Sequence, residues 1–233
     1  MYFGHYAVAV AIKAKEPDIP AAPLLLGTGF LDIMNGAFIV AGLDKVTGNL
    51  QASPYLFFDL TFIDWDHSLL MSIFWSLLYG LICWLLYKKN NRIAMFSVLV
   101  TFLHFVADLP MHNADMALYP HSDIKLGMGL WGSLGTWSWV LEIAFSAVLL
   151  GYAWKQHQKR DENIWMQISF ITLLSISMSP WLSPMKKIAV LPESEATFLH
   201  GTFVFLGFII PSIIFICMYK RTDRKRIVNT YEE

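Results

Sequence analysis

Long apolar segments alternate with short polar connections along almost the whole chain. A helix that crosses a bilayer needs about 20 mostly apolar residues, and six segments meet this requirement. They lie at about 22–43, 68–87, 91–109, 132–154, 163–182 and 198–219. A shorter apolar run, Tyr6 to Ile12, is followed by charged residues and by Pro17 and Pro20, which end a helix. The pattern predicts an all-α, polytopic integral membrane helical bundle. It would have about six transmembrane helices and a short N-terminal half-helix, in a single transmembrane domain over residues 1–233.

Composition strengthens this prediction. Hydrophobic residues make up 56% and charged residues 15% of the 233 residues, whereas a soluble domain usually carries about 25% charged residues. A disordered chain, a disulfide scaffold and a nucleic-acid binder are therefore excluded. The two cysteines, Cys83 and Cys217, lie in apolar runs, which favours packing roles over a disulfide or a metal site.

The few charged residues are distributed unevenly over the connections. Basic residues concentrate in the second and fourth connections and after the last span: Lys88, Lys89, Arg92, Lys155, Lys159, Arg160, Lys220, Arg221, Arg224, Lys225 and Arg226. Because lysine and arginine are enriched in cytoplasmic loops, both termini are expected to be cytoplasmic. The opposite face then carries most of the acidic residues and the two long connections, at about 44–67 and 110–131. Long loops on one face of a scaffold are a usual place for function.

The third predicted span ends in the most distinctive polar pattern. His104 and Asp108 are four residues apart, so on a helix they point the same way, one turn apart. An imidazole and a carboxylate placed in this way can bind one cation. Pro110 ends the helix, so His112 is free to fold back over the same site. The alternative for this segment is a hydrogen-bonded pair in which His104 and Asp108 satisfy each other without a metal.

Two further segments bring ionisable side chains toward the same face. Asp64, Asp66 and His67 lie at the mouth of the second predicted span, where Asp66 could also be an ordinary helix cap. Asp32 is a lone carboxylate within the first predicted span, and such a group needs a partner. A cation shared with His67 and the His104 pair would supply it, and this convergence favours a metal site.

Two other ionisable residues lie within predicted spans. Glu142 and His200 are interpreted either as hydrogen-bonded packing residues or as functional polar groups. Asn35 or a tryptophan indole is the expected partner of Glu142. The group of Trp131, Trp137 and Trp139 is typical of the aromatic belt at a membrane surface.

These motifs together resemble a known family. Gly4-His5-Tyr6, Asp32, His67-Ser68-Leu69-Leu70 and His104-x3-Asp108 are similar to motifs of the bacterial membrane-bound metal-dependent hydrolases. The stretches 111–120 and 125–131 look closer still to an uncharacterised multi-span subgroup of these inner-membrane proteins. The resemblance covers about residues 4–142. It implies a location in the bacterial inner (cytoplasmic) membrane.

A more distant similarity is to the zinc-dependent phospholipase C and single-strand nuclease family, whose members have a His-x3-Asp helix followed by Pro-(Met/Leu)-His. Carried over, this resemblance implies that Asp32, His67, His104 and Asp108 hold one ion and that His5 with Asp108 holds a second. The N-terminal Trp ligand and the later His-x3-Glu pair of that family are missing here, and Leu103 replaces the Ser that precedes His104 in the bacterial hydrolases. One or two ions, most simply zinc, are therefore expected. His5 can join them only if its segment dips into the membrane beside the first span.

The predicted chemistry is hydrolysis of a phosphoester or related bond of a lipid-like substrate, with membrane lipids as the surrounding partners. Asp64 or Asp66 would act as general base or as partner of His67, and His112 would assist in catalysis. Lys125 and Asp115 are the candidate substrate-binding residues, Lys125 because it could meet a phosphate. The alternative is a transporter or permease with an intramembrane ion or proton site. A membrane scaffold with a structural metal is a third interpretation.

Overall fold

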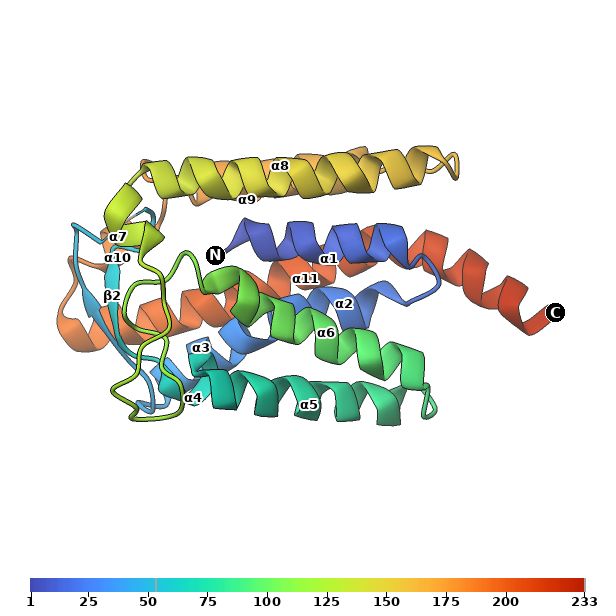
Figure 1. The fold of residues 1–233 in the computed structure, drawn as a ribbon. Coiled ribbons are helices and arrows are strands. Elements are labelled where there is room, and N and C mark those ends of the chain that lie inside the picture. The colour runs from blue at the N-terminus through green and yellow to red at the C-terminus, as the bar shows by residue number, and fades with distance from the viewer. Residues whose placement is uncertain (53, 233) are drawn as a thin grey trace.

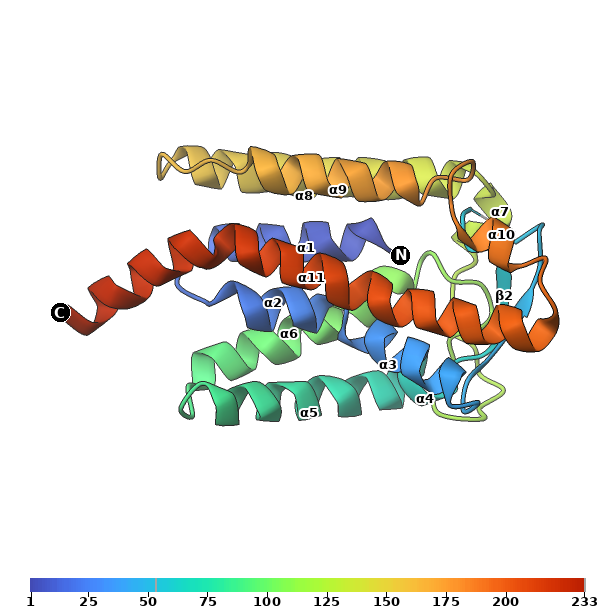
Figure 2. The ribbon, with the colours of Figure 1, turned by 180° about the vertical axis from the view of Figure 1, so that it is seen from behind.

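The computed structural model describes residues 1–52 and 54–232 and is mainly helical (Figure 1). In chain order its elements are α1 (Phe3–Lys15), α2 (Ala21–Thr28), α3 (Phe30–Val40), β1 (Lys45–Gly48), β2 (Phe58–Phe62), α4 (Asp64–His67), α5 (Leu69–Leu86), α6 (Asn91–Asp108), α7 (Leu130–Leu134), α8 (Trp137–Gln158), α9 (Trp165–Ser177), α10 (Met185–Ile188) and α11 (Glu193–Glu232). The long helices run side by side in one bundle, as both views show (Figures 1 and 2).

Four of the described helices are long and apolar enough to cross a membrane: α5, α6, α8 and the part of α11 over Glu193–Lys220. A fifth candidate is the pair α2 and α3, which are bent by 47° at Gly29. The prediction of a mainly helical fold with several helices long and apolar enough to cross a membrane is thus confirmed, whereas six spans are not. The fifth predicted span, 163–182, forms only the 13 residues of α9, because Pro180 and Pro184 follow soon after Ser177.

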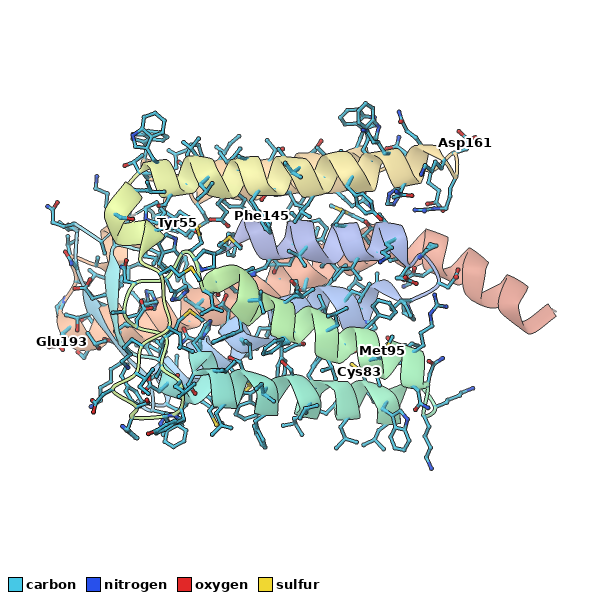
Figure 3. All side chains as sticks on the ribbon, in the orientation of Figure 1. Tyr55, Cys83, Met95, Phe145, Asp161 and Glu193 are labelled. Atoms are coloured by element: carbon cyan, nitrogen blue, oxygen red, sulfur yellow. The ribbon has the colours of Figure 1, made fainter. Side chains whose placement is uncertain are left out.

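The outer faces of the spanning helices are apolar. Leu77 and Leu85 on α5, Val148 on α8 and Ile210 on α11 are exposed, and side chains of this kind project outward along the bundle in Figure 3. Exposure of so large an apolar surface to water is unfavourable for a monomer, whereas lipid tails would cover the surface.

The predicted N-terminal half-helix is the centre of the bundle rather than a peripheral segment. α1 is surrounded by α8, α2, α9 and α6, and Phe3, Tyr6 and Val10 on it are fully buried. Its alanines let neighbouring helices approach closely. At its far end Glu16 pairs with Arg92 over 2.6 Å, so α1 runs from the loop end of the bundle to the end that carries the short turns (Figure 1).

The two long connections fold together at one end of the bundle. The first contains an antiparallel pair of strands, β1 and β2, which the sequence pattern did not predict. The second is pinned at both sides, since Leu69 N donates to Ala117 O and Met128 N donates to Leu109 O. Both connections therefore form a fixed cap over the ends of α3, α5 and α6 (Figure 2).

Candidate metal centre

The C-terminal end of α6 carries the predicted His-x3-Asp pair. His104 and Asp108 are buried and one helical turn apart, with His104 Nε2 3.1 Å from Asp108 Oδ2. Beyond Pro110 the chain turns back, because the backbone N–H groups of Met111 and His112 both donate to Asp108 O at 2.9 Å. This turn brings His112 Nε2 to 3.7 Å from Asp108 Oδ2. The predicted return of His112 over the site is confirmed.

His67 comes from the short helix α4, which precedes α5. Ser68 has an extended backbone and caps α5, accepting from Met71 N at 3.4 Å. This break between α4 and α5 directs the His67 ring into the bundle. His67 Nε2 lies 3.6 Å from Asp108 Oδ2 and 3.6 Å from Asp32 Oδ1.

Asp32 reaches the centre through the bend between α2 and α3. Gly29 occupies the bend, where a Cβ would come within 2.7 Å of the Phe208 ring, so the close approach of α11 requires glycine. Asp32 lies in the first turn of α3. Its Oδ2 is 3.4 Å from His104 Nε2.

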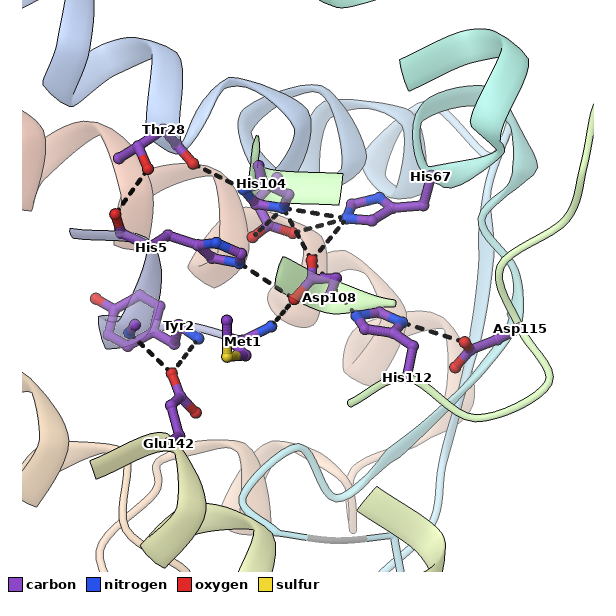
Figure 4. A network of polar contacts seen from close by, with 12 residues as sticks. Met1, Tyr2, His5, Thr28, His67, His104, Asp108, His112, Asp115 and Glu142 are labelled. Atoms are coloured by element: carbon purple, nitrogen blue, oxygen red, sulfur yellow. Dashed lines mark hydrogen bonds and ion pairs between the residues drawn. The ribbon is translucent and has the colours of Figure 1, made fainter. Parts of the chain in front are cut away.

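His5 also joins the group, because α1 lies inside the bundle. Its Nε2 is 3.2 Å from Asp108 Oδ1, and its ring stacks on His104 with centroids 3.7 Å apart. The Met1 amino nitrogen donates to the same Asp108 oxygen (Figure 4). Asp108 is therefore the shared carboxylate of four imidazoles, those of His5, His67, His104 and His112.

Two of these imidazoles are oriented by a hydrogen bond at their other ring nitrogen (Figure 4). His104 Nδ1 lies 2.7 Å from Thr28 O, and His112 Nδ1 lies 3.1 Å from Asp115 Oδ1. An Nδ1–H that donates to an oxygen leaves the lone pair on Nε2, as metal-binding histidines usually have it. His67 Nδ1 lies 3.2 Å from Asp66 Oδ2, within ion-pair distance, but forms no hydrogen bond with the described residues.

A cation fits this arrangement. The Nε2 atoms of His67 and His104 are only 3.3 Å apart, and two lone pairs at that distance repel unless a proton or a metal ion lies between them. Asp108 Oδ2 and both ring nitrogens of His5 are buried and have no hydrogen-bond partner among the described residues. Three overlapping groups have ligand atoms within 4.8 Å of one another: His5, His104 and Asp108; Asp32, His67 and His104; His67, Asp108 and His112. Histidine nitrogen and carboxylate oxygen are the ligands of open zinc sites.

The centre carries an excess of negative charge. Burial opposes the charged form of His67, but Asp66, Asp108 and Asp32 outweigh it and raise the pKa of His67 well above its usual value. The Met1 ammonium already faces Asp108, and a metal ion would compete with a proton on His67.

The other predicted site residues lie around the group rather than within it. Asp66 is the partner of His67, and Asp115 is the partner of His112. Asp64 faces away, accepting from His121 N at 2.8 Å and lying 3.6 Å from Lys125 Nζ. Asp64 and Lys125 thus fasten the second long connection to α4, and neither contacts the ligand group.

Sequence reasoning missed what holds α1 in place. Glu142 accepts from Tyr2 N at 2.7 Å, from Gly4 N at 3.0 Å and from the Tyr55 hydroxyl at 2.6 Å. The expected partners, Asn35 or a tryptophan indole, were wrong. Because the first N–H groups of a helix lack partners within it, Glu142 caps α1 and so fixes His5. A buried glutamate in an apolar span was the only signal in the sequence.

Comparison with other proteins adds no relative. No known protein family matches the sequence, and no curated protein or solved structure is significantly similar to it. The arrangement of the cluster is therefore the basis for any functional conclusion.

Proposed function

We propose that this protein is a membrane-embedded, metal-dependent hydrolase, related to the bacterial membrane-bound hydrolases whose motifs it resembles. One observation carries the proposal: four imidazoles from three separate segments converge on Asp108, and two of them, those of His104 and His112, are oriented by a hydrogen bond to an oxygen at Nδ1. A cluster that only satisfied its own polar groups would not need so many imidazoles with their Nε2 atoms facing one another.

The ligands for one or two divalent ions, most simply zinc, would be His5, Asp32, His67, His104 and Asp108. An ion held there lowers the pKa of a bound water to about 7 and polarises a phosphoryl or carbonyl oxygen. The hydrogen bond from His104 Nδ1 to Thr28 O keeps the His104 Nε2 lone pair directed at the centre before an ion binds. Asp66 lies beside His67 Nδ1 and would stabilise a positive charge on that ring.

His112 is the residue best suited to move a proton. Its Nε2 is the farthest of the four from Asp108, and its Nδ1 faces the Asp115 carboxylate, which would stabilise the imidazolium. In the proposed reaction the water oxygen bonds to phosphorus, the ester P–O bond breaks, and the leaving oxygen takes a proton from His112 Nε2. The attacking water returns a proton to the same imidazole.

The orientation in the membrane follows from the charges. The start of α6 with Arg92, the last turn of α8 with Lys155 and the turn after α8 with Arg160 lie at the end of the bundle opposite the metal centre (Figure 1). With these basic residues on the cytoplasmic side of a bacterial inner membrane, the metal centre would face the non-cytoplasmic side. Met1 lies at the metal centre, so α1 begins near that side and not at the basic end, where residues 1–20 were expected.

Purified protein tests the proposal by metal-dependent hydrolysis of a generic phosphodiester and of phospholipid vesicles. We expect turnover with zinc that a chelator abolishes and that Asp108→Ala lacks. Metal-dependent ion uptake into liposomes without hydrolysis would instead establish the transporter alternative and overturn the proposal. Full metal content without either activity would establish the scaffold.

A further inference from the structure

An apolar cavity of about 260 Å³ adjoins the metal centre. Asp32, His67 and His112 form one part of its wall, so ligand residues face into it. Most of the remaining wall is apolar and includes Leu60, Met178, Met185, Val204 and Phe208. The cavity is smaller than the pockets of about 300–1,000 Å³ that hold whole drug-sized molecules. It suits a segment of a hydrocarbon chain.

We place the opening of the cavity at the side of the bundle, between α9 and α11, because residues at the end of α9 and on α11 line it. Ser177 and Met178 at the end of α9 line it together with Phe203 and Gly207 of α11. Ser177 and Phe203 are also exposed on the outside of the bundle, so the same side chains border both the cavity and the outer surface. Figure 2 shows α9 and α11 running along the same side of the bundle.

The surface around this opening is apolar. Ile176 on α9 and Phe198 and Leu206 on α11 are exposed next to it, and this part of α11 belongs to a candidate membrane span. Lipid chains, not water, would therefore meet the opening. A molecule that reaches the metal centre by this path must come from the bilayer.

A second cavity, of about 190 Å³, lies on the other side of a thin wall. Leu56, Leu60 and Trp131 line both cavities. The second cavity lies among the capping loops and is also lined by Asp59 and Asp115. Because Asp115 holds His112, which lines the first cavity, the metal centre lies between an apolar space that faces lipid and a polar space among the loops.

We propose that the apolar cavity binds the hydrocarbon chain of a membrane lipid that enters sideways between α9 and α11. The phosphate ester of that lipid then lies against Asp32, His67 and His112, and its polar headgroup extends toward the second cavity. This inference rests on the proposed hydrolase function and deepens it, since it makes the substrate a phosphate-containing lipid and not a soluble ester.

Gly207 offers a way to close the cavity. Gly207 lines the cavity, and a Cβ added there meets nothing nearer than the Tyr2 ring, at 3.9 Å, so Gly207→Phe adds a ring at the cavity wall without a clash at Cβ. Gly151 on α8 is the matched control, because a Cβ there has no neighbour within 4 Å and Gly151 does not line the cavity.

The test uses the full chain in lipid nanodiscs with a phospholipid or a prenyl phosphate that carries a photoreactive group in mid-chain. We expect labelling of wild type at Met178, Phe203 and Val204, at least tenfold weaker labelling of Gly207→Phe, and unchanged labelling of Gly151→Phe. Comparison of the two lipids tells an acyl chain from a prenyl chain. In Gly207→Phe, hydrolysis of long-chain esters should fall at least tenfold more than that of short-chain esters.

The labelling of wild type needs no variant and no activity, so it separates this inference from the proposed function. Label confined to the outer faces of α5 and α8, or hydrolysis of short-chain esters with no label in the cavity, would overturn the inference alone. Label in the cavity of a protein that hydrolyses neither lipid would overturn the proposed function, and with it the role of the cavity as a substrate site.

Discussion

Asp108→Asn should abolish the metal site while leaving the bundle folded. The Asp108 carboxylate faces His5, His67, His104 and His112 at 3.1–3.7 Å, and Asn has the same shape without the charge. Removing a residue that only supports a metal ligand typically costs about 10–100-fold in metal affinity. Asp108 itself belongs to two of the three ligand groups, so we expect its loss to lower metal affinity more than about 100-fold.

The affinity is measured by competition with a chromophoric zinc chelator, on detergent-purified protein. Glu142→Gln is the control, because Glu142 is equally buried but accepts from Tyr2, Gly4 and Tyr55 and lies outside the ligand groups. It should lower the unfolding temperature yet keep zinc affinity within about tenfold of wild type. Equal zinc affinity of wild type and Asp108→Asn would show that the Asp108 carboxylate does not hold the ion.

Three further changes test the surroundings of the centre. Asp66→Ala removes the carboxylate beside His67 Nδ1 and should weaken zinc binding about 10–100-fold in the same competition assay. Unchanged zinc affinity would show that Asp66 does not support His67 as a ligand. Burial and the Asp66 carboxylate raise the pKa of Asp44 from 3.8 to about 9. Between these values the folded chain keeps the Asp44 proton and the unfolded chain loses it, so the free energy of unfolding should fall as pH rises, by at most about 1.4 kcal/mol per pH unit. Melting temperatures at successive pH values should fall less in Asp44→Asn. Gly36→Ala places a Cβ 2.5 Å from Phe205 N and should lower the free energy of unfolding, measured in detergent, by about 1–3 kcal/mol. An unfolding midpoint equal to that of wild type would show that α3 and α11 can move apart to make room for the methyl group.

Hydrophobic patterning predicted the membrane helices well where a span is regular. The segments expected at 68–87 and 91–109 are α5 and α6, with ends within one or two residues. It failed at 22–43, which is two helices, because the bend at Gly29 depends on the approach of Phe208 from α11. Nothing local distinguishes such a glycine from one inside a straight helix. The strand Phe58–Phe62 is likewise short and paired only in the folded chain.

The sequence predicted those members of the ligand group that lie close together along the chain. The spacing of His104 and Asp108 placed them on one helix face, and Pro110 predicted the return of His112. His5 came only from the resemblance to known hydrolases, since its position depends on α1 lying inside the bundle. Asp66 was a candidate partner of His67 because it is the adjacent residue, but the contact that orients His104 is invisible in the sequence: Thr28 acts through a backbone carbonyl 76 residues from His104.

The metal content of the purified protein shows whether the His and Asp cluster binds an ion. The full chain, purified in detergent, loaded with zinc and freed of loosely bound ions, is analysed by mass spectrometry beside His104→Ala and Asp108→Ala. We expect one or two equivalents of zinc in wild type and less than a tenth of that in both variants. Wild type without bound zinc, or variants that bind as much zinc as wild type, would contradict the proposed metal site.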